Sequence, residues 1–217
     1  MDVYLEVGKK RVFACSLQWP GWCRSGRTEE LALAALADYA PRYGIVAARA
    51  GLVLPAADAD GFRVVERLPG TATTDFGAPD REAGDDTGPT AAAAARRMAA
   101  LVVAAWEVFD EVGGQSPAEL RKGPRGGGRE RDKMIDHVLS SDAAYARKIG
   151  IRVRPPELAD PAAVTEMREA IIAILGTPSD GTSPAPNGWP TRYAARRIAW
   201  HALDHAWEMQ DRADLAD

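Results

Sequence analysis

Two of the three histidines in the chain, His201 and His205, stand four residues apart near its C-terminus. They lie in segment 197–212, which contains no glycine or proline and is predicted to be one helix. Positions i and i+4 share a helix face, so the two imidazoles can bind one metal ion. The apolar stripe runs through Ile198 and Ala202, and both histidines are expected to face the interior of the protein.

The remaining histidine, His137, also lies on a predicted helix, beside Met134 and Val138. A single inward-facing histidine is most often a hydrogen-bonded core residue. Here every histidine is expected to face inward from a helix, and two of them share a face. This pattern favours one divalent metal site formed by His137, His201 and His205. Three core histidines without a metal are the alternative.

Three imidazoles would leave one coordination position of a zinc ion open, as in catalytic rather than structural zinc sites. Water in that position has its pKa lowered towards neutrality, and a thiol is held there as a thiolate. Zinc is the favoured metal, and nickel, manganese and iron are compatible with the same ligands.

Two carboxylates accompany the histidine pair. Glu208, three residues after His205, is the candidate catalytic residue, because it could act as a general base or orient a ligand histidine. Asp204 could orient His201 in the same way. The alternative is that both form outward ion pairs with Arg197 and Arg212. Among the neighbouring aromatic residues, the candidates for pocket walls are Tyr145 and Trp200, although core packing would account for both.

The composition is that of an ordinary globular protein: 217 residues, 46% hydrophobic and 27% charged. The net charge of −4 argues against nucleic acid as a partner. We expect no membrane span and no signal peptide, and therefore a cytoplasmic protein. Its two cysteines cannot build a disulfide framework.

Helical periodicity predicts four long helices after residue 90. They are expected at 90–112, 129–148, 161–175 and from 191 onward. Gly113-Gly114 should end the first, and a short extra helix is predicted at 116–122. Basic residues surround the glycine-rich loop that follows, and they could receive an anionic substrate or simply be solvated: Arg121, Lys122, Arg125, Arg129 and Arg131.

The first 70 residues are predicted to form a separate α+β unit. Strands are expected at 3–7, 11–17 and 61–68, and a helix from Thr28 to Tyr39 or Tyr43.

Two tryptophans, Trp19 and Trp22, could form a binding surface, but packing on the sheet or between the two units is favoured. Cys23 as a reactive thiol is a minor alternative. Residues 71–89 form a connector, either flexible or ordered along the helices; Phe76, as an apolar anchor, favours the ordered form.

The segments 136–145 and 201–208 resemble the DinB/YfiT-like superfamily, and the likeness covers roughly residues 88–212. It implies an all-α four-helix bundle over 90–217, with one metal-binding histidine on its second helix (His137) and an H-x-x-x-H pair on its fourth (His201 and His205). The superfamily includes thiol-dependent transferases and isomerases. The resemblance therefore implies a small-molecule substrate and a low-molecular-weight thiol of the mycothiol type. A hydrolase is an alternative interpretation.

Residues 17–33 are similar to the HicB-type antitoxin fold, through a Pro-Gly turn and a Thr-Glu-Glu helix start. This likeness implies a partner-binding α+β module over residues 1–70. The rival functional hypothesis is thus a non-catalytic protein that binds a partner through this module while the metal braces the bundle. A homodimer is compatible with either hypothesis.

Overall fold

The N-terminal part of the chain folds as a mixed four-stranded sheet with the order β3-β2-β1-β4. The structure is a computed structural model that describes residues 1–56, 58–121 and 130–213. The central strand β1 is antiparallel to β2 and parallel to β4, and β2 is antiparallel to β3. The strands are β1 (Asp2–Val7), β2 (Val12–Ser16), β3 (Cys23–Gly26) and β4 (Arg63–Pro69). The sequence predicted three of them, but not β3.

Two helices, α1 (Glu29–Asp38) and α2 (Ala40–Arg49), follow the third strand. Thr28 caps α1 as predicted, since its hydroxyl accepts a hydrogen bond of 3.2 Å from the backbone N of Leu31. A single helix was predicted here. Pro41 instead stands in the first turn of a second helix, where its missing N–H costs nothing.

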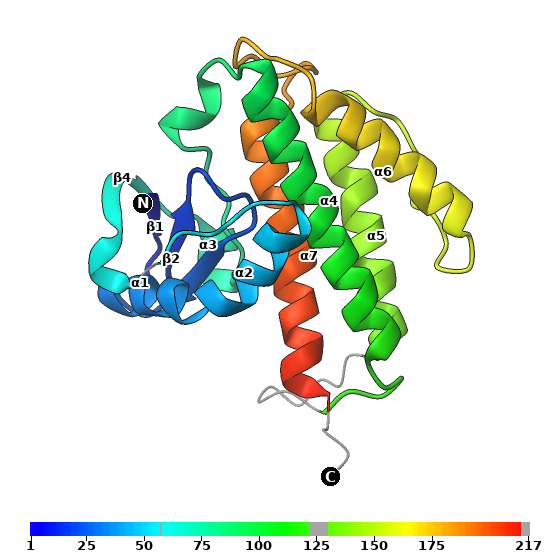
Figure 1. The fold of residues 1–217 in the computed structure, drawn as a ribbon, viewed down its shortest axis with the longest axis horizontal. Helices are drawn as coiled ribbons and strands as arrows, with labels where there is room; N and C mark the ends of the chain where they lie inside the picture. Colours follow the sequence, from blue (N-terminus) through cyan, green and yellow to red (C-terminus); the bar gives the residue numbers. More distant parts are fainter. Residues whose placement is uncertain (57, 122–129, 214–217) are drawn as a thin grey trace.

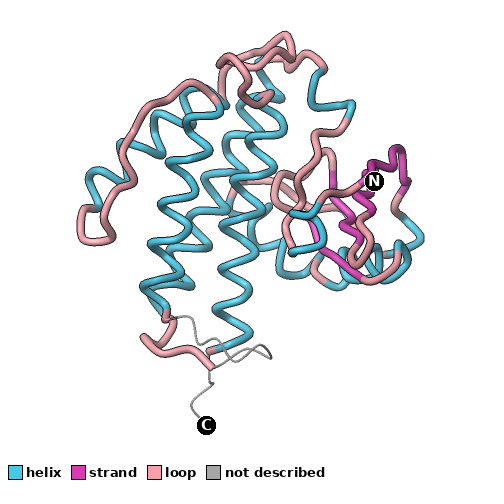
Figure 2. The backbone as a smooth tube through the Cα atoms, turned by 180° about the vertical axis from the view of Figure 1, so that it is seen from behind, coloured by secondary structure: helices cyan, strands magenta, loops and turns pink. Residues whose placement is uncertain are grey.

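The two middle strands, β1 and β2, are buried on both faces, between α1 and α2 on one side and α7 on the other (Figures 1 and 2). The edge strand β4 exposes every second residue. On the face toward α1 and α2, Trp22 stacks on Tyr43 with 5.4 Å between ring centroids. On the opposite face, Phe13 meets Trp200 of the last helix edge to face at 6.1 Å. The predicted packing role of the tryptophans is confirmed, because Trp19 and Trp22 are both buried.

The connector between the two parts is ordered. It contains α3 (Ala72–Phe76) and a 3-10 turn, η2 (Gly84–Thr87). Another 3-10 turn, η1 (Ala59–Gly61), lies outside the connector, before β4. Its anchors are polar: Thr74 bonds to Glu6, and Asp86 pairs with Arg196. Phe76 is 77% exposed, so the prediction that it anchors the connector was wrong.

Four long helices pack against one another beside the sheet. They are α4 (Ala92–Gln115), α5 (Arg131–Lys148), α6 (Pro161–Leu175) and α7 (Thr191–Arg212). The helix α7 contacts the other three, and its first half also faces the sheet (Figure 1). Within the described ranges, no helix has the length and apolar character needed to cross a bilayer.

Two predicted boundaries in this region were wrong. The helix α4 continues through Gly113 and Gly114 to Gln115, and Gly113 lies where an added Cβ would stand 3.2 Å from Ile135 of α5. Close packing between the two helices thus explains the glycine. The described residues 116–121 are not helical, whereas a short helix was predicted there.

Candidate metal centre

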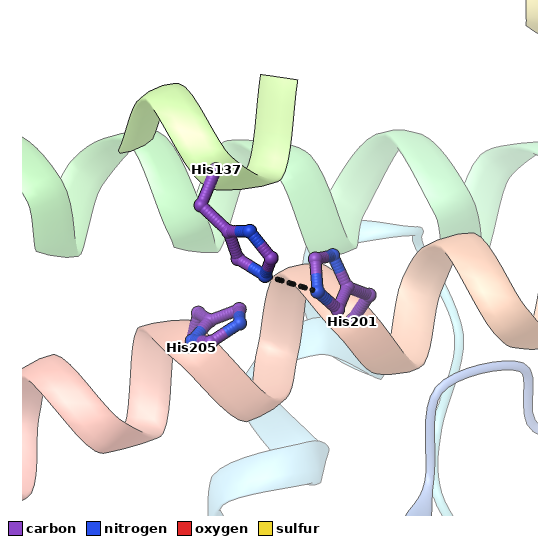
Figure 3. Close-up of side chains that lie close together, drawn as sticks. All are labelled: His137, His201 and His205. Carbon is purple, nitrogen blue, oxygen red and sulfur yellow. Dashed lines mark hydrogen bonds between the residues drawn. The ribbon is translucent and has the colours of Figure 1, made fainter. Parts of the chain in front are cut away.

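The helices α5 and α7 bring the three histidines together (Figure 3). One ligand nitrogen from each of His137, His201 and His205 lies within 4.8 Å of the other two. The Nε2 atoms of His137 and His201 are 3.2 Å apart, and the ring centroids of His201 and His205 are 4.7 Å apart. The predicted ligand set is therefore one spatial cluster.

The spacing of these nitrogens fits a small divalent ion. Tetrahedral zinc with Zn–N bonds of about 2.0–2.1 Å separates its ligand nitrogens by roughly 3.3 Å. The 3.2 Å between His137 and His201 matches this value, and small side-chain adjustments would bring in the nitrogen of His205. Among the described residues, this group contains no fourth histidine, cysteine, aspartate or glutamate. A metal held by the three imidazoles would keep an open coordination position.

Glu208 fixes one of the candidate ligands. Its Oε2 lies 3.0 Å from Nδ1 of His205, and its Oε1 lies 2.8 Å from a guanidinium nitrogen of Arg212. A carboxylate can only accept, so Nδ1 carries the proton and Nε2 of His205 keeps its lone pair for a metal. Carboxylates that orient histidine ligands in this way raise their basicity. Glu208 thus combines the predicted orienting contact with the predicted ion pair to Arg212.

Asp204 does not orient His201. It pairs with Arg24 of β3 at 2.9 Å, and not with Arg197 as the sequence suggested. The guanidinium of Arg24 also lies 3.9 Å from the ring centroid of Tyr39 and 5.4 Å from that of Trp207. The N-terminal part of the chain therefore holds the histidine-bearing helix directly.

The three histidines differ in exposure. His201 and His205 are buried on α7, as predicted, but His137 is exposed, so the expectation that all three face inward was wrong. Its ring points from α5 toward His201 and His205 on α7 (Figure 3), yet it remains accessible to solvent. One side of the cluster is consequently open to solvent, which a substrate needs for access.

The two aromatic candidates have different positions. Tyr145 is half-buried on α5, and its ring centroid is 5.7 Å from that of His201. Trp200 is buried against the sheet and belongs to the core. The ring of Trp200 also lies near His201, with 6.0 Å between centroids, but Tyr145 is the less buried of the two beside the candidate site.

Two further sequence hypotheses concern groups elsewhere. Cys15 and Cys23 are buried free cysteines, and burial raises the pKa of the Cys23 thiol well above its usual value, which disfavours a reactive thiolate. Of the basic loop, Lys122, Arg125 and Arg129 lie outside the described residues. Arg121 donates to the carbonyl of Asp211, and Arg131 pairs with Asp132.

Arg24 and Tyr39 were not among the predicted site residues. Their positions in the sequence lie far from α7, and no local pattern connects them to the histidines. Comparison of the chain with protein-family models, with curated proteins and with solved structures finds no match.

Proposed function

We propose that this protein is a divalent-metal-dependent enzyme that uses His137, His201 and His205 as ligands. The observation that carries the proposal is the convergence of the three ligand nitrogens within 4.8 Å, with Glu208 bonded to His205. Bound there, zinc would supply a Lewis acid that stabilises a thiolate or activates water. The chain itself orients His205 through Glu208 and leaves the His137 side open.

The reaction class rests on the resemblance of residues 88–212 to the DinB/YfiT-like superfamily. It supports a transferase or isomerase that acts on a small molecule together with a low-molecular-weight thiol. A hydrolase could use the same open position. In either reaction, Glu208 is the positioning residue for His205.

The rival hypothesis is a metal that only braces the helices while a HicB-like module binds a partner. Structural zinc sites are closed by four protein ligands. Within the described part of the chain, the cluster has three, and one of them is exposed. These observations favour the catalytic hypothesis.

Metal content of the untagged protein tests the proposal, measured by inductively coupled plasma mass spectrometry. We expect about one divalent ion per chain in the wild type and none in His137→Ala or His205→Ala. The exposed position of His137 makes His137→Ala the cleaner variant, because little core packing is lost. Glu208→Gln should retain the ion with roughly 10- to 100-fold weaker affinity. Glu166→Gln, at an exposed position on α6, is the matched control.

One result would refute the proposal. It is a folded wild type that contains no metal and takes up neither zinc, nickel, manganese nor iron on reconstitution. The three histidines would then be packing residues, and the N-terminal part would become the place to look for function.

A further inference from the structure

A polar strip continues from the metal centre along the facing sides of α5 and α7. On α7, Arg197 precedes His201 by one helical turn, and on α5, Tyr145 follows His137 by two. Tyr145 lies close to both His201 and Arg197. Its ring centroid is 5.7 Å from that of His201 and 5.6 Å from Cζ of Arg197. The strip thus places a phenol and a guanidinium beside the candidate ligands.

Arg197 is held in place without being neutralised. Its Nη1 donates a hydrogen bond of 2.6 Å to the carbonyl of Pro79, and its Cζ lies 4.8 Å from the ring centroid of Trp200. The ion pairs on this side of α7 involve other arginines, since Asp204 pairs with Arg24 and Glu208 with Arg212. Within the described residues Arg197 itself forms no ion pair. A half-buried, fixed guanidinium of this kind is suited to bind a carboxylate.

Tyr145 can contribute a donor to the same ligand. A tyrosine phenol is ordinarily protonated at neutral pH, and its O–H can donate to a carboxylate oxygen. Half-buried beside His201, it stands where a metal-bound ligand would pass toward Arg197.

We propose that Arg197 and Tyr145 bind the carboxylate of a ligand whose reacting atom occupies the open position at the three-histidine centre. This inference rests on the proposed function and specifies its substrate class as a carboxylate-bearing small molecule. One turn of α7 separates Arg197 from His201, on the order of 6 Å along the axis. The reacting atom and the carboxylate should therefore be joined by a short spacer.

Ligand preference of the cobalt(II)-substituted protein tests the inference. Mercaptopropionate and mercaptoethanol are similar in size, bind a metal through the same thiolate, and differ in charge at the other end. The cobalt absorption spectrum reports binding of each. In the wild type we expect mercaptopropionate to bind at least about tenfold more tightly, the usual scale of a charge-assisted contact.

Three variants assign that preference to particular groups. Arg197→Met should abolish it, and Tyr145→Phe, which leaves Arg197 and its bond to the carbonyl of Pro79 in place, should reduce it several-fold. Arg192→Met is the matched control, because Arg192 also lies on α7 and donates to a connector carbonyl, that of Pro89, but does so near the start of the helix. It should leave the preference unchanged. Cobalt stoichiometry and circular dichroism confirm that each variant is folded and loaded.

The outcomes separate this inference from the proposed function. A cobalt site that binds both thiols equally overturns the inference alone. So does a preference that persists in Arg197→Met and Tyr145→Phe, because the carboxylate would then chelate the metal itself. A wild type that binds no cobalt refutes the metal-dependent function, and this inference with it.

Discussion

Asp142 is a buried carboxyl on α5, and Nε1 of Trp106 donates a hydrogen bond of 3.0 Å to its Oδ2. Burial raises its pKa from 3.8 to about 7, although Arg168 and the bond from Trp106 oppose the rise. The folded protein therefore keeps a proton on Asp142 at a pH where the unfolded chain has lost it. Such a group stabilises the fold in acid and loses this contribution as pH rises through about 7.

Asp142→Asn should remove this pH dependence. Between about pH 4 and pH 7 the folded wild type binds up to about one proton more than the unfolded chain at this group. Its free energy of unfolding should therefore fall with a slope approaching about 1.4 kcal/mol per pH unit. Asparagine keeps an acceptor for Trp106 and cannot ionise, so the variant should gain on the wild type as pH rises. Thermal melts from about pH 5 to pH 8 measure the difference. Asp132→Asn, exposed on the same helix, is the control, and parallel curves for Asp142→Asn and the wild type would contradict the prediction.

At the scale of elements, the strand β3 and the helix α7 are joined by Arg24 and Asp204. The two side chains are 20% and 33% exposed, so solvent weakens their attraction, while the rings of Tyr39 and Trp207 add cation–π contacts. A double-mutant cycle with Arg24→Met and Asp204→Asn in urea unfolding should give a coupling free energy of about 1 kcal/mol. The control pair is Arg63 and Asp2, where the arginine side chain is 74% exposed. Its coupling should stay below about 0.5 kcal/mol; equal coupling in both cycles would argue against a special link to α7.

The elements that the sequence predicted best are those with local end signals. The bounds of α6 agree with prediction: Asp160 caps it, Pro161 stands in its first turn, and Gly176 follows its last residue. The low helix propensity of glycine predicted that α4 ends at Gly113. The helix continues because Gly113 packs against Ile135 of α5, a tertiary contact that helix propensity does not include. β3 is only four residues long and exists through its pairing with β2.

The candidate site divides in the same way. The proximity of His201 and His205 follows from helix geometry alone, and the contact of Glu208 with His205 follows from their spacing of three residues. The exposure of His137 depends on how α5 is rotated against its neighbours, which the sequence pattern did not resolve. Arg24 reaches Asp204 across 180 positions of sequence, and only the tertiary fold brings them together.

At the scale of the whole molecule, the connector joins the sheet to the long helices through buried polar contacts. Glu6, near the C-terminal end of β1, is fully buried and accepts hydrogen bonds from the hydroxyl of Thr74 and from the backbone N of Asp80 and Arg81, the last two at 2.8 Å and 3.0 Å. Further along the connector, Asp86 pairs with the buried Arg196 of α7. One segment thus bonds to the sheet at one end and to the histidine-bearing helix at the other.

Glu6→Gln should loosen this segment because it places an NH₂ group where three donors converge. One unsatisfied buried donor or acceptor costs about 1–3 kcal/mol, so we expect a loss of that size in the free energy of unfolding. Amide hydrogen exchange should accelerate over residues 72–87, which carry α3 and η2.

Glu66→Gln is the matched control. Oε2 of Glu66 also accepts a hydrogen bond from the connector, 2.8 Å from the backbone N of Gly84, but at an exposed position where water can replace the bond. Its cost should be less than about 1 kcal/mol. Equal effects of the two substitutions would mean that the contacts of Glu6 do not order the connector. The position of the connector would then depend on the pair of Asp86 and Arg196 alone.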